Sequence, residues 1–248
     1  MYRGNYPSFA AARRAAGGYE NPNILTRIAE AAAQVRDGQA VFERDGVTFD
    51  HPEYRFPLLT GLLRAALLEN QELRLADFGG ALGSSYFQCR PFLNGLKSLR
   101  WCVVEQPHVA ARGREEFRNG QLDFYDTIGD CVRSERPNLL LLSGTLQYLP
   151  DPYAVLDELL QYRIPHLIVD RTPILHNFPD RITIQRVPSQ IYGIEVSYPA
   201  WFLNGLKLLG AISRSYDIIT EFEALAGVIS LEDTRAVDMG LNCQLRNL

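Results

Sequence analysis

Leu73-Arg74-Leu75-Ala76-Asp77-Phe78-Gly79-Gly80-Ala81-Leu82-Gly83-Ser84-Ser85 carries the chain from a short apolar run, through an acid and three glycines, to an amphipathic segment at 86–96. This order predicts a strand, a tight turn and a helix. The glycines allow positive φ angles and let a ligand approach the backbone closely. Ser84 or Ser85 is a candidate cap for the helix that follows.

The acid at the end of the strand indicates which ligand the turn would bind. A dinucleotide-binding turn has the pattern Gly-x-Gly-x-x-Gly, whereas this chain has Asp-x-Gly-Gly-x-x-Gly at 77–83. The carboxylate of Asp77 would repel a pyrophosphate and attract an ammonium group. The pattern therefore favours a nucleoside that carries an amino acid over NAD, and it leaves open a tight turn that binds no ligand.

The turn resembles motif I of the class I S-adenosylmethionine (SAM) methyltransferases. It departs from their usual Asp-x-Gly-x-Gly-x-Gly because position 80 is Gly and position 81 is Ala. The resemblance implies that SAM is the cofactor and that this turn binds it. The turn residues concerned are Asp77, Gly79, Gly80, Gly83 and Ser84.

Composition is that of a globular protein, with 248 residues, 46% hydrophobic, 22% charged, and a net charge of −4. This length suits one large α/β domain or one domain with a modest extension. The acidic balance does not favour nucleic acid as a partner. The four cysteines are scattered without a Cys-x-x-Cys pair, which predicts a reducing compartment and no metal site. No apolar run is long enough to span a membrane, so we expect a cytoplasmic protein.

Residues 1–70 are predicted to form a mainly helical extension before the SAM-binding domain at 71–248. Helices are expected at 8–16, at 24–36 with Asn23 as its cap, and at 57–68. Asp45-Gly46 between two apolar runs is a strong signal for a two-residue hairpin. In methyltransferases of this type such an extension often covers the cofactor. Simple packing of the extension against the sheet is the alternative.

After the glycine turn, apolar runs alternate with helical patterns. Strands are expected at 101–104, 122–124, 139–142 and 166–169, and helices at 109–118 and 151–162. Such a pattern predicts a parallel sheet with helices on both faces. The expected fold is α/β and Rossmann-like, with strand order 3-2-1-4-5 and an antiparallel closing pair at 216–222 and 240–246. We expect an insertion over the active-site edge at about 173–200, followed by a helix at 201–209.

Ligands of such sheets bind beyond the carboxyl ends of the strands. Glu105 lies 22 positions beyond Gly83 at the end of the second strand, where an acid can accept both ribose hydroxyls of a nucleoside. Its alternative role is that of an acid favoured at a helix start. Phe124 offers an apolar face for adenine and Asp126 an acceptor for its amino group, although Phe124 could equally belong to the core.

Five segments together resemble a bacterial family of SAM-dependent methyltransferases, often encoded beside genes for lipopolysaccharide O-antigen or other surface polysaccharides. The resemblance implies that Gln106 contributes to the cofactor site. It also implies that the turn of Ser143, Gly144 and Thr145 runs beside the sulfonium and the acceptor. The implied acceptor is a small molecule such as a sugar or nucleotide sugar, and a homodimer is an expected assembly. The segments are 77–86, 103–106, 143–149, 170–173 and 198–201.

The expected reaction is O-methylation of a sugar or another small polar acceptor. It requires an acceptor atom in line with the sulfonium, and a sugar hydroxyl must also lose its proton. Asp170 and His176 are the candidate bases, Tyr148 is a candidate orienting group, and Arg171 is a candidate anion clamp. Asp170 and Arg171 could instead pair with each other, and His176 could be an exposed loop residue.

The aromatic residues of the 173–201 region are candidates for stacking on a sugar ring. They are Tyr192, Tyr198 and Trp201, and their alternative role is to pack the insertion onto the domain. Two further functions remain open from the sequence. One is a nicotinamide-dependent oxidoreductase, disfavoured by Asp77 and by the absence of a Tyr-x-x-x-Lys pair. The other is a SAM-fold subunit without catalysis.

Overall fold

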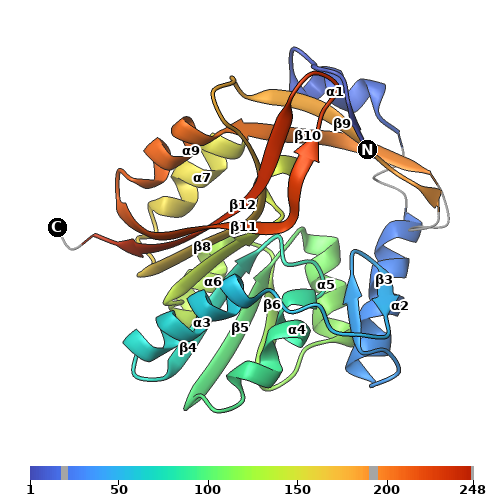
Figure 1. The fold of residues 1–248 in the computed structure, drawn as a ribbon. Coiled ribbons are helices and arrows are strands. Elements are labelled where there is room, and N and C mark those ends of the chain that lie inside the picture. Colours follow the sequence, from blue (N-terminus) through green and yellow to red (C-terminus); the bar gives the residue numbers. More distant parts are fainter. Residues whose placement is uncertain (18–21, 190–194, 247–248) are drawn as a thin grey trace.

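A computed structural model describes residues 1–17, 22–189 and 195–246 of the chain. Its centre is a sheet of five parallel strands in the order β6-β5-β4-β7-β8, which confirms the predicted order 3-2-1-4-5 (Figure 1). The strands are β4 (Glu72–Phe78), β5 (Ser98–Val104), β6 (Leu122–Tyr125), β7 (Leu139–Ser143) and β8 (His166–Leu175).

Both faces of this sheet are buried under helices. Alternate residues of each strand point to opposite faces, so each strand contributes to two core clusters. In β7, Leu139 and Leu141 belong to one core cluster, and Leu140 and Leu142 to the other. The first cluster contains residues of α3 (Phe56–Leu68), α4 (Ser84–Leu93) and α5 (Pro107–Glu116). The second contains residues of α6 (Ile128–Glu135), α7 (Pro152–Leu160) and α9 (Gly205–Ile212).

The closing pair is antiparallel, as predicted, but longer than the sequence indicated. It consists of β11 (Tyr216–Ser230) and β12 (Arg235–Leu245), with β12 also paired to β8. Both strands extend beyond the parallel sheet toward β1 (Tyr2–Arg3) (Figure 1). Their far ends pack there, since Ala236 and Ile229 share an apolar cluster with Tyr2.

Two predictions for the region after Asp170 are wrong. The strand predicted at 166–169 does not end there but continues as β8 to Leu175. The expected helix at 201–209 is replaced by β10 (Val196–Asn204) and then α9, because Asn204 caps the helix by accepting the Lys207 N–H at 2.8 Å. Strand β10 pairs antiparallel with β9 (Arg181–Val187), which in turn pairs with β1. The insertion at about 173–200 stays a prediction.

The N-terminal region contains α1 (Phe9–Ala15), α2 (Pro22–Arg36) and a hairpin of β2 (Phe42–Arg44) and β3 (Val47–Phe49). The hairpin turn is as predicted, with positive φ at both Asp45 and Gly46. Helix α2 begins at Pro22, so Asn23 lies inside it and does not precede it. No helix among the described residues is long and apolar enough to cross a membrane.

Two more local predictions need correction. Neither Ser84 nor Ser85 caps α4, because the helix already begins at Ser84 and its N-cap is Gly83 in the left-handed region at φ 89°. Helix α6 was not predicted; it is short, and the hydroxyl of Thr127 caps it by accepting the Asp130 N–H at 3.1 Å. Eight residues give too few turns for a clear helical period.

Candidate functional site

A cavity of about 570 Å³ lies at the carboxyl ends of the central strands, with the β2–β3 hairpin forming part of its wall. This is where open parallel sheets bind ligands. Most of the residues predicted for the site line it, whereas Gly83, Phe124, Asp170 and His176 do not. Those that line it are Asp77, Gly79, Gly80, Ser84, Glu105, Gln106, Asp126, Ser143, Gly144, Thr145, Tyr148 and Arg171.

The turn after β4 packs so closely that two of its glycines are required by shape. A Cβ on Gly79 would lie 2.5 Å from the side chain of Thr145, and a Cβ on Gly80 would lie 2.5 Å from the carboxyl group of Asp77. Gly79 also has a φ of 76°, which disfavours other residues. Ala81 adopts a φ of 50° without being glycine. Backbone strain of this kind persists where the surroundings hold it, often at a binding site.

Asp77 lies at the base of the cavity and is only 1% exposed. The indole Nε1 of Trp101 donates a hydrogen bond to its Oδ2 at 3.0 Å. Burial raises the pKa of Asp77 to about 6, because the carboxylate has lost most of its water. A cation in the cavity would favour the ionised form, so the site is electrostatically suited to a ligand with an ammonium group.

Glu105 joins the turn to the end of β5. Its Oε1 accepts the N–H of Ala81 at 3.3 Å and its Oε2 accepts the N–H of Gln106 at 2.8 Å. The carboxylate thus holds the turn in place, and because each of its oxygens can accept a further bond, it can also bind hydroxyl groups in the cavity. Burial raises its pKa.

At the end of β6, two residues expected to contact adenine lie in different places. Phe124 is 2% exposed and packs in the core against α5, where a Cβ on Gly113 would lie 2.3 Å from its ring. The interpretation as a core residue therefore describes its position. Asp126 lines the cavity and accepts a hydrogen bond from Arg114 at 2.8 Å.

A β-bulge places Asp170 and Arg171. Met239 of β12 pairs with Thr172, and Leu241 pairs with Val169. Asp170 and Arg171, which lie between these partners on β8, therefore face only Gly240 on β12. Arg171 adopts a φ of 52°. Bulges redirect side chains in this way. The guanidinium of Arg171 reaches the cavity wall, where its Nε donates to Ser143 Oγ at 3.2 Å.

Arg55 is the main charged residue that the sequence analysis missed. It precedes α3, and its Nη1 donates to Asp170 at 2.5 Å and to Ser143 at 2.9 Å. Its Nη2 donates to Ser85 at 3.0 Å and to Gln88 at 3.2 Å. Asp170 is thus paired with Arg55. The only signal in the sequence was an arginine directly before an apolar helix.

Of the other candidates, Tyr148 lies at the site and His176 does not. The hydroxyl of Tyr148 donates to Gln185 of β9 at 2.9 Å, and its ring packs against Tyr198. His176 is exposed six residues beyond Asp170, and because a strand advances about 3.3 Å per residue, it lies roughly 20 Å farther along the chain. Trp201 donates to the carbonyl oxygen of Leu149 at 2.9 Å and is not part of the wall. Tyr192 lies outside the described residues.

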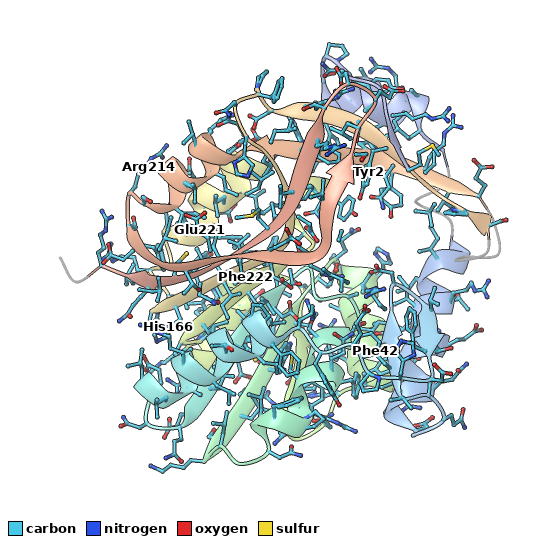
Figure 2. The ribbon with its side chains drawn as sticks, in the orientation of Figure 1. Tyr2, Phe42, His166, Arg214, Glu221 and Phe222 are labelled. Carbon is cyan, nitrogen blue, oxygen red and sulfur yellow. The ribbon has the colours of Figure 1, made fainter. Side chains whose placement is uncertain are left out.

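A second cavity of about 370 Å³ adjoins the first. The two share several lining residues, including Gly144, Tyr148 and Arg171. Tyr2 of β1 lines the second cavity, and Phe42 of the hairpin lines the first (Figure 2). The second cavity also contains Asp238 of β12, which the sequence analysis missed, although an acid within an apolar strand was a signal that could have found it.

The sequence matches no protein-family model and no curated protein. Among solved structures, the N-terminal domain of EvdMO1, crystallised in the presence of SAH and D-fucose, has a TM-score of 0.50 at 13% identity, over 93% of this chain and 100% of that one. A SAM-dependent methyltransferase from Methanosarcina mazei also has a TM-score of 0.50, at 12% identity, over 79% of this chain and 99% of the other. The chain therefore has the Rossmann-like fold of SAM-dependent methyltransferases.

Proposed function

We propose that the protein is a SAM-dependent methyltransferase that acts on a small polar acceptor such as a sugar. The observation that carries this proposal is the wall of the first cavity, where the carboxylates of Asp77 and Glu105 face one space across the Gly79–Gly80 turn. The fold supports it, as does the SAH in the similar EvdMO1 domain. The D-fucose in that crystal and the family resemblance at 143–149 support a sugar as the acceptor.

The residues of the cavity fit SAM. Asp77 would face the ammonium group, which would relieve the cost of its buried charge. Glu105 would accept the ribose hydroxyls while it holds the turn. Asp126 lies on the same wall with Thr127 and Ile128, where an adenine ring would find both apolar contact and an acceptor. The volume of about 570 Å³ lies within the range of small-molecule sites.

In the reaction, the acceptor's lone pair would bond to the methyl carbon while the carbon–sulfur bond breaks toward sulfur, and the acceptor's proton would pass to water. The chain's contribution is to orient the acceptor against the methyl group. Tyr148 and Arg171 line both cavities and are placed to position an acceptor. Asp170 accepts hydrogen bonds from Arg55 and Ser143 and holds Arg55 in place. The exposed His176 takes no part in the reaction.

The β2–β3 hairpin and α2 supply part of the cavity wall, through Arg44, Asp45 and Ile28. This supports the proposal that the N-terminal extension covers the cofactor. A lid that excludes water would strengthen the electrostatic contacts with the bound ligand.

The test of the proposed function is calorimetric titration with SAH and NADH. We expect SAH to bind and NADH not to bind. Glu105→Ala should lower the affinity for SAH about tenfold or more, because it removes charge-assisted hydrogen bonds. The matched control is Glu115→Ala, an exposed glutamate on the helix that follows, which should change little. A wild-type protein that binds NADH and not SAH would refute the proposal.

A further inference from the structure

The second cavity is built from parts of the chain that lie far apart in sequence. Tyr2 of β1, Asp45 of the hairpin, Gln185 of β9 and Asp238 of β12 all line it. It shares Gly144, Tyr148 and Arg171 with the first cavity, so the two spaces adjoin. Its volume of about 370 Å³ is at the small end of the range for small-molecule sites.

Gln147 lines this cavity and holds its amide group in a fixed orientation. The Nε2 of Gln147 donates to the carbonyl oxygen of Arg171 at 3.0 Å, which fixes the orientation of the amide. Its Oε1 is buried and has no hydrogen-bond partner within the part of the chain that the structure describes, and the residue is 7% exposed. Because this oxygen has almost no accessible surface, Gln147 shapes the wall of the cavity and leaves ligand binding to its charged residues.

Asp238 supplies a carboxylate to the lining of this cavity. It lies opposite residues 224–227, which bulge out of β11 because Glu223 pairs with Met239 and Val228 pairs with Val237. The N–H of Ala226 in this bulge donates to Asp238 Oδ2 at 2.9 Å and holds the carboxylate in place. Burial raises the pKa of Asp238, as expected for a carboxylate that no cation fully compensates.

The charges of the lining favour a cation over an anion. Arg44 is paired with Glu53, and the guanidinium of Arg171 lies against Ser143. Burial, together with the carboxylates of Asp238 and Asp45, raises the pKa of Tyr2 to about 12. The lining contains three carboxylates and two guanidiniums. Surplus negative charge in a cavity concentrates cations and repels anions.

We propose that the second cavity binds the methyl acceptor and that this acceptor is an amine-bearing polyhydroxylated molecule of monosaccharide size. The carboxylate of Asp238 binds its ammonium group. This inference rests on the proposed function, because it takes the first cavity as the SAM site.

The experiment uses the full chain saturated with SAH and three probes: glucosamine, glucose and glucuronate. Binding is measured for each by titration calorimetry or saturation-transfer NMR. We expect glucosamine to bind best and glucuronate worst, a ranking that needs no variant. Equal binding of glucosamine and glucuronate, a preference for glucuronate, or no binding by any of the three overturns the proposal. SAH binding is measured first, so failure here is distinct from failure of the proposed function.

Asp238→Asn tests the assigned residue, since asparagine keeps the shape and can still accept the Ala226 N–H. The variant should bind glucosamine about tenfold more weakly than the wild type does, and no more tightly than it binds glucose. SAH affinity should stay within about twofold, which separates a lost contact from a lost fold. The matched control is Asp217→Asn on β11, where the exposed carboxylate pairs with Arg246. Glucosamine binding that is unchanged in Asp238→Asn overturns the assignment.

Discussion

At the scale of single residues, Asp77 combines a buried charge with a place on the cavity wall. Its carboxyl group needs water or a cation when ionised, and Trp101 supplies only one hydrogen bond. The raised pKa of about 6 means that the folded protein binds the proton more tightly than the unfolded chain, whose aspartate keeps its ordinary value near 3.8. Folding stability should therefore be highest at low pH with respect to this group, and fall as the pH rises through about 6.

Asp77→Asn should remove the loss of folding stability that the ionisation of Asp77 causes as the pH rises. Above about pH 6, we expect the variant without ligand to be more stable than the wild type, by an amount on the order of 3 kcal/mol. The same change should lower the affinity for SAH, because the ammonium group of the ligand loses its counter-charge. Urea unfolding at about pH 5 and about pH 8, together with SAH titration at the higher pH, measures both effects. Equal pH dependence of stability in the two proteins would contradict the prediction.

At the scale of elements, the bulge between β8 and β12 controls where Arg171 points. Gly240 is the single residue opposite Asp170 and Arg171, and the ring of Phe222 on β11 packs against it. A Cβ on Gly240 would lie 2.1 Å from that ring. The glycine thus makes room for the Phe222 ring beside the bulge.

Gly240→Ala should destabilise the protein by about 1–3 kcal/mol, because either the ring or the strand must move. Gly210→Ala is the control: this exposed glycine lies in α9, and a Cβ there meets nothing within 4 Å. It should stabilise the protein by up to about 1 kcal/mol, since alanine is the better helix former. Urea unfolding measures both, and a Phe222→Ala background should reduce the cost of Gly240→Ala. A cost that persists in that background would show that the ring is not the cause.

At the scale of the whole molecule, Arg55 ties the N-terminal region to the carboxyl ends of the sheet. One guanidinium joins the start of α3 to β7 through Ser143, to β8 through Asp170, and to α4 through Ser85 and Gln88. The Arg55 and Asp170 side chains are 10% and 2% exposed, so neither charge can rely on water if the other is removed.

Arg55→Met should cost about 3–5 kcal/mol of folding free energy, because it leaves the carboxylate of Asp170 buried without its cation. Adding Asp170→Asn should recover a large part of that cost. The control is Arg133→Met, which breaks the exposed pair with Asp130 and should cost less than about 1 kcal/mol. Urea unfolding of the four proteins gives the coupling energy. Additive costs for Arg55→Met and Asp170→Asn would contradict the prediction.

Much of the fold could be predicted from the sequence, because its signals are local. The apolar runs at 73–76, 101–104 and 139–142 are buried on both faces, and such runs alternate with helices only in a parallel sheet. The glycine turn after Asp77 and the hairpin at Asp45-Gly46 require φ angles that few other residues adopt. The same local chemistry placed Asp77, Glu105 and Ser143–Thr145 at one edge of the sheet.

Only the tertiary structure decided the rest of the site, because it depends on contacts between distant residues. Nothing near Asp170 in sequence indicates that Arg55 neutralises it, and the bulge that redirects Arg171 exists only where Gly240 of β12 meets β8. Asp238 reaches the second cavity because a bulge in β11 lies opposite it. His176 was misplaced for the complementary reason: the pairing of β8 with β12 and β10 carries that strand beyond the point where its apolar run ends. Sequence periodicity reports which face of an element is buried, whereas pairing between strands decides which side chains meet.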